Sequence, residues 1–110
     1  GVTFRKERMA RFEPHTFSAD IAAMITDHAA ALGLQHIAMV SGAGHDAQIL
    51  GRRCPAAMIF VPSVDGISHN IKEHTLPHHV IAGSDVLLRT LVSLADEVEA
   101  PVARTLESAT

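Results

Sequence analysis

Apolar side chains recur at helical spacing in two long stretches of the chain, and these stretches predict its two main helices. The first covers residues 18–32, where Ser18 is suited to the N-cap and Gly33 to the position just past the C-cap. The second begins near Pro77, because proline suits the first turn of a helix. We expect Pro101 to end or kink that helix and the residues after it to fray.

The shorter blocks predict strands and one short helix. The continuous apolar run AAMIFV at 56–61, bounded by prolines, indicates a buried strand, and residues 36–40 indicate a second. The charged, loosely alternating stretch 2–12 indicates an exposed edge strand, and 46–50 a short helix that ends at Gly51. The elements thus follow the order β-α-β-α-β-α, led by the edge strand. That order favours an α/β fold with a largely parallel pair of central strands.

Composition fits one small domain with a packed interior. The chain has 110 residues, of which 47% are hydrophobic, and its mean hydropathy is +0.19. A chain of this length buries about two thirds of its unfolded surface. Because the hydrophobic fraction is high for so short a chain, either the core is tight or part of the apolar surface expects a partner.

Several classes of function are disfavoured by the same numbers. A net charge of −3 and an aromatic content of 4% argue against nucleic-acid binding. No apolar run approaches the roughly 20 residues of a membrane-spanning helix, and no signal-peptide pattern opens the chain. The single cysteine, Cys54, excludes an internal disulfide, is interpreted as an inert thiol, and is typical of a reducing setting. We therefore expect a cytoplasmic protein.

Two polar loops flank the run at 56–61 and are the best candidates for chemistry. In the first, SGAGHDA at 41–47, the glycines let the backbone approach a ligand, and His45 and Asp46 offer a donor and an acceptor. The alternative is a plain glycine turn in which Asp46 begins the short helix favourably. Local features alone favour that alternative, and the spacing matches neither a dinucleotide fingerprint nor a P-loop.

The second loop, GISHN at 66–70, carries His69 in a setting suited to a metal ligand. One histidine is no metal site, since structural zinc takes four protein ligands and catalytic zinc usually three. His74 and His78 stand at helical spacing, but a solvated helix start is the simpler interpretation. The metalloprotease motif HEXXH is absent.

Together these segments resemble a known family. SGAGHDAQ, then AAMIFVPS, DGISHN and EHT, then GSDVLLRTLVSLA, are similar to the C-terminal end of the hydantoinase/carbamoylase amidases. That group includes N-carbamoyl-L-amino acid hydrolases, β-ureidopropionases and allantoate amidohydrolases, within the wider zinc-dependent aminoacylase and carboxypeptidase-type peptidases. The resemblance covers residues 12–96.

The resemblance implies that the chain is the C-terminal portion of a metallopeptidase-like α/β catalytic domain. It also implies a divalent metal cofactor, for which zinc is expected and manganese or cobalt are the alternatives. It implies a small ureido or carbamoyl substrate and a homo-oligomer, which on the composition given above we expect to bind neither nucleic acid nor membrane. His69 matches the family's last metal ligand, and Gly44 and His45 match positions that line the substrate pocket. Residues 1–13 look like the strand that leaves an inserted dimerisation domain, and 14–110 like the C-terminal part of the catalytic domain.

Much of the family's machinery has no counterpart here. The chain contains no His-x-Asp triplet and no Glu-Glu pair, which carry the family's other ligands and its general base. Ile71 and Lys72 also replace the proline-acidic pair often seen after the loop. We therefore expect a piece of a linear C–N amidohydrolase that is inactive alone. The alternative is a stand-alone α/β module that binds a metal or ligand, or oligomerises, without catalysis.

Overall fold

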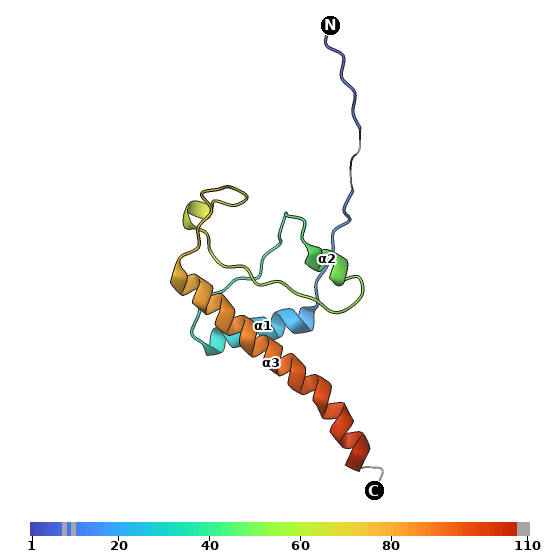
Figure 1. Ribbon diagram of the computed structural model, residues 1–110, viewed down its shortest axis with the longest axis vertical. Coiled ribbons are helices and arrows are strands. Elements are labelled where there is room, and N and C mark those ends of the chain that lie inside the picture. Colours follow the sequence, from blue (N-terminus) through green and yellow to red (C-terminus); the bar gives the residue numbers. More distant parts are fainter. Residues whose placement is uncertain (8, 10, 108–110) are drawn as a thin grey trace.

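A computed structural model describes residues 1–7, 9 and 11–107, with side chains as far as Glu97. It is built on helices and long connecting segments (Figure 1). In chain order the elements are α1 (Ala19–Ala31), α2 (Asp46–Leu50), the 3₁₀ helix η1 (Val64–Gly66) and α3 (Pro77–Glu107).

Helix α1 has the boundaries that its sequence predicts. The Ser18 hydroxyl accepts a 3.3 Å hydrogen bond from the backbone N–H of Ile21 and caps the helix. At the other end Gly33 takes a φ of +69°, a left-handed conformation that costs glycine little. The start of α2 at Asp46 and its end before Gly51 are likewise confirmed.

Helix α3 begins at Pro77, as expected, but it does not end at Pro101, which was one of the two outcomes expected there; the other, a kink at Pro101, stays a prediction. The helix runs through Pro101 to Glu107, so neither a stop at Pro101 nor fraying directly after it is observed. A proline removes one backbone hydrogen bond, and a long helix can continue past that loss. Residues 108–110 lie outside the described residues. None of the described helices is long and apolar enough to cross a membrane.

The three expected strands are absent from the part of the chain that the structure describes. Stretches 2–12, 36–40 and 56–61 contain no strand residues among those described, so the β-α-β order is not confirmed. The physical reason is that a strand exists only where its backbone groups pair with a neighbour. Here the backbone N–H of Ser18 donates to the carbonyl of Ala56 (2.9 Å), which ties this segment to α1 rather than to another strand.

The core is small and lies between α1 and α3, which pack against each other (Figure 1). Among the described residues its buried apolar members are Ala29 and Val86, with Thr90 buried beside them. His28 Nε2 lies 3.0 Å from Ser93 Oγ, and this contact links the two helices.

Many large apolar side chains are exposed in the part of the chain that the structure describes. The accessible surface is 9633 Å², whereas a folded monomer of 11.7 kDa exposes about 5,900 Å². The radius of gyration is 19.6 Å, against about 13 Å for a globular domain of this length. The run at 56–61 is not fully buried as expected, since Phe60 is 51% exposed. Of the two explanations for the high hydrophobic content, the structure favours an apolar surface that expects a partner.

Candidate functional site

The SGAGHDA loop ends on His45, which is the N-cap of α2. Its Nδ1 accepts a 3.0 Å hydrogen bond from the backbone N–H of Ala47. In return, Gln48 Oε1 accepts a 3.4 Å bond from the backbone N–H of His45. This reciprocal pair is a capping box in which an imidazole takes the place of the usual serine or threonine.

The capping bond determines which ring nitrogen of His45 can serve a ligand. Because Nδ1 accepts a hydrogen bond, a neutral imidazole must carry its proton on Nε2. The residue is exposed, so this N–H is free to donate to a ligand oxygen. Gly44, next to it, is exposed as well. Asp46 stands in the first turn of α2, as the plain-turn alternative also requires, so local geometry is consistent with both interpretations.

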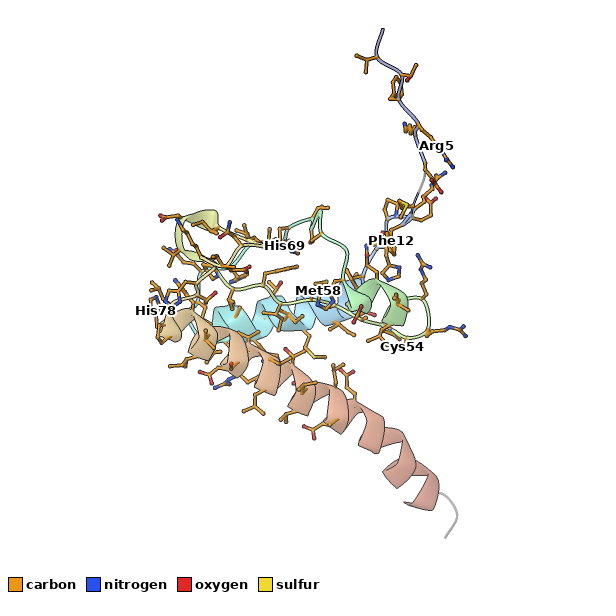
Figure 2. All side chains as sticks on the ribbon, turned by 45° about the horizontal axis from the view of Figure 1, so that its top comes forward. Arg5, Phe12, Cys54, Met58, His69 and His78 are labelled. Carbon is orange, nitrogen blue, oxygen red and sulfur yellow. The ribbon has the colours of Figure 1, made fainter. Side chains whose placement is uncertain are left out.

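The GISHN loop holds His69 in an uncommon backbone conformation. Its φ is +53°, in the left-handed region that few residues with a Cβ adopt. The backbone N–H of His69 donates to Glu73 Oε2 at 2.9 Å. Figure 2 shows His69 among the connecting loops, on the opposite side of α1 from the long helix α3. Such outliers often mark functional positions, and this one lies at the candidate metal ligand.

The structure does not gather a complete metal site around His69. Among the residues that it describes, no group of three or more His, Cys, Asp or Glu side chains could hold a metal ion. The rings of His78 and His79 lie 4.0 Å apart at the start of α3, but they belong to no such group. His69 therefore remains a single candidate ligand, and the described donors do not fit a metal by themselves.

Two contacts at these loops were not anticipated from the sequence. The capping role of His45 was missed because histidine is not among the favoured N-cap residues, although Gln48 three positions later is a capping-box signal. The bond from His69 to Glu73 was missed because it crosses an irregular turn. A carboxylate four residues after a loop histidine is the only signal that sequence offered.

The family is shown by comparison with known proteins. Residues 2–93 match the profile of Peptidase family M20/M25/M40, and the chain belongs to this family. The resemblance that the sequence shows over residues 12–96 is thereby confirmed.

Individual relatives agree with this assignment. The chain is 37% identical to an N-carbamoyl-L-amino-acid amidohydrolase of Rhizobium meliloti, over 90% of this chain and 24% of that protein. It is 44% identical to an allantoate amidohydrolase of Bacillus subtilis, over 86% of this chain and 23% of that protein. The chain thus spans less than a quarter of the length of these relatives.

A solved structure shares the fold. It is the crystal structure of a Burkholderia cenocepacia protein, itself named only provisionally as an amidohydrolase/peptidase. The TM-score is 0.73 at 45% sequence identity, over 79% of this chain and 21% of that one. At this identity and score the aligned 79% of this chain has the arrangement of the corresponding part of that protein.

Proposed function

We propose that this chain is the C-terminal part of the catalytic domain of a metal-dependent amidohydrolase that cleaves a linear C–N bond of the N-carbamoyl-amino-acid or allantoate type. One combination of observations supports this most. The chain belongs to the M20/M25/M40 family, its relatives are named for those activities, and its described residues contain one candidate ligand without companions.

In this proposal His69 supplies one ligand to a divalent metal, and the remaining ligands and the general base come from other segments of the family domain. Bound metal in such sites activates water toward a carbonyl carbon. Zinc is the first candidate, because a neutral imidazole is a common zinc ligand, and manganese or cobalt are the alternatives. The left-handed backbone of His69 supports a role beyond connection.

Gly44 and His45 form part of the wall of the substrate pocket. The exposed Nε2–H of His45, set by the capping bond to Ala47, is suited to donate to the oxygen of a carbamoyl or ureido group. Gly44 has open space around it, with only Gln48 Oε1 within 4 Å of where a Cβ atom would be, so a ligand can approach its backbone.

The proposed boundaries follow the family pattern. Residues 1–13 contain no strand residues among those that the structure describes, but we propose that in the parent protein they pair as the strand that leaves an inserted dimerisation domain, and that 14–110 belong to the catalytic domain. In Figure 1 the N-terminal residues extend away from the helices, which is consistent with a segment whose contacts lie elsewhere. We further propose a homo-oligomeric parent protein in the cytoplasm.

The isolated chain is expected to be inactive, because one histidine cannot hold a catalytic metal. The test has two arms with the same substrates, allantoate and N-carbamoyl amino acids, and with added zinc, manganese or cobalt. The first arm assays the 110-residue chain. The second assays a chimera in which this chain replaces the segment that it matches in the Bacillus subtilis allantoate amidohydrolase.

We expect no turnover by the chain and clear turnover by the chimera. Turnover by the isolated chain that is lost in His69→Ala would refute its inactivity. A folded chimera without activity on either substrate class would refute the assigned chemistry. Tight stoichiometric binding of zinc by the isolated chain, lost on substitution of His69 together with His74 or His78, would instead support the stand-alone binding module.

A further inference from the structure

We propose that Glu73 is a positioning residue for His69: its carboxylate holds the backbone of the candidate metal ligand in the left-handed conformation. The inference rests on the proposed function, because only the ligand role of His69 gives this geometry a purpose. The contact itself is independent of that role.

The geometry is a short closed loop. Glu73 Oε2 accepts a 2.9 Å hydrogen bond from the backbone N–H of His69. Between the two residues the chain makes a turn, in which the backbone N–H of Glu73 donates to the carbonyl of Asn70 (2.9 Å). The turn brings the Glu73 side chain back to His69, the residue that precedes the turn.

A second bond strengthens the turn without reaching His69. Asn70 Oδ1 accepts a 2.9 Å hydrogen bond from the backbone N–H of Lys72, a common way for asparagine to stabilise a tight turn. Asn70 therefore shapes the turn, whereas Glu73 is the residue whose side chain bonds the His69 backbone in the described part of the chain.

The left-handed conformation needs such a restraint. A residue with a Cβ atom at φ +53° crowds its own backbone and persists where surrounding contacts hold it. A hydrogen bond from an N–H to a carboxylate is shorter and stronger than one between neutral groups. Glu73 thus supplies a charged acceptor at the strained residue.

The consequence for the site concerns the direction in which the His69 side chain points. The backbone torsions of His69 determine where its Cβ atom, and hence its imidazole, points. Groups that orient a metal-binding histidine without touching the metal typically change metal affinity by about 10- to 100-fold when they are removed. Here the orienting bond is made to the backbone of the histidine instead of to its ring.

The test uses nuclear magnetic resonance of the 110-residue chain and follows the His69 backbone amide. Glu73→Ala removes the acceptor, Glu73→Gln keeps a side-chain oxygen at the same reach, and Lys72→Ala is the neighbouring control. We expect Glu73→Ala to move the His69 amide proton upfield and to speed its exchange with solvent about tenfold, the ratio that corresponds to roughly one hydrogen bond. Glu73→Gln should recover most of both effects, and Lys72→Ala should change neither.

Two results of the amide measurements would overturn the positioning role. One is a His69 amide shift and exchange rate that are unchanged in Glu73→Ala. The other is a Glu73→Gln variant that behaves like Glu73→Ala, because a missing oxygen acceptor could not then be the cause.

The same variants in the chimera separate this inference from the proposed function. We expect the zinc dissociation constant to rise about tenfold in Glu73→Ala and to stay near its original value in Glu73→Gln. If His69→Ala leaves the zinc affinity of the chimera unchanged, the ligand assignment fails, while the amide measurements still decide whether Glu73 holds the loop. If His69→Ala abolishes zinc binding but Glu73→Ala does not weaken it, the positioning role is wrong and the proposed function stands.

Discussion

The side chain of Val61 packs directly onto the backbone of α3 at Gly83. The Val61 Cγ1 atom lies 2.5 Å from the place that a Cβ atom would occupy on Gly83. This close approach joins the 56–61 segment, which leads to the candidate metal loop, to the long helix. Position 83 requires glycine because of this contact and not because of its backbone conformation, since the φ of Gly83 is not in the left-handed region.

Substituting Gly83 by alanine should therefore destabilise the chain. Overpacking costs about 1–3 kcal/mol and alanine gains roughly 1 kcal/mol over glycine inside a helix, so the net loss of stability is up to about 2 kcal/mol. Valine is stiff about its first torsion and cannot swing aside easily. Urea unfolding followed by circular dichroism measures the difference.

The matched controls are Gly42→Ala and the double variant Gly83→Ala with Val61→Ala. Gly42 has no atom within 4 Å of its added Cβ, so its substitution should be nearly neutral. The double variant should regain stability relative to Gly83→Ala alone. Equal or higher stability of Gly83→Ala itself would show that the segment and α3 do not pack as described.

His45 has a structural role and a proposed ligand role, and two substitutions distinguish them. Asparagine is a good N-cap and keeps the cap of α2, whereas alanine loses it, at a cost of about 1 kcal/mol. Hydrogen exchange at the amides of α2 should be faster in His45→Ala and unchanged in His45→Asn. Both variants lack the exposed Nε2–H donor.

In the chimera both His45 variants should then bind substrate more weakly. If His45 donates to a carbamoyl or ureido oxygen, KM should rise in His45→Asn even though α2 remains capped. A His45→Asn chimera with the original KM and kcat would limit His45 to the capping role that the structure describes.

The unpartnered apolar surface predicts self-association. On α3 a row of large apolar side chains is about half exposed, comprising Leu87, Leu88, Leu91 and Val92. Exposed patches of this kind drive association in water. Analytical ultracentrifugation should find dimers or larger species at high concentration, and Leu88→Lys with Leu91→Lys should reduce their mass. A monomer of the original chain at all concentrations would count against an incomplete domain.

Local sequence signals were sufficient for α1, α2 and the start of α3, whereas η1 was not predicted. Ser18, Gly33 and Pro77 act through their own backbone neighbours, so the ends that they predict agree with the structure. Pro101 misled because a proline's local effect on a long helix does not decide whether the helix continues. Each of these signals concerns hydrogen bonds within a few residues.

The formation of strands could not be predicted from local sequence signals in the same way. The composition of the 36–40 and 56–61 runs is typical of strands, but pairing needs a neighbour, and the described residues supply none. Ile37 and Val40 are 82% and 94% exposed, as expected of a strand-like sequence without its sheet. Sequence therefore predicted what these segments are suited to form rather than what they form in this chain.

For the candidate site, sequence identified the two loops and the family, whereas the contacts came from the structure. The roles of His69, Gly44 and His45 remain predictions. The imidazole cap on α2 replaces the serine or threonine that a capping box usually has, and the Glu73 contact depends on the geometry of an irregular turn. The family resemblance predicted a ligand role for His69 that the local sequence could not predict, because one histidine alone does not define a metal site.

The most direct test of the account is the metal content of the chimera, measured by elemental analysis after dialysis, with His69→Ala compared against His74→Ala. His74 is an exposed histidine near the end of the same loop region and belongs to no metal-holding group of the described residues. The account predicts that His69→Ala loses metal and that His74→Ala retains it in full. Full metal content in His69→Ala would contradict the claim that this chain contributes His69 as its one ligand.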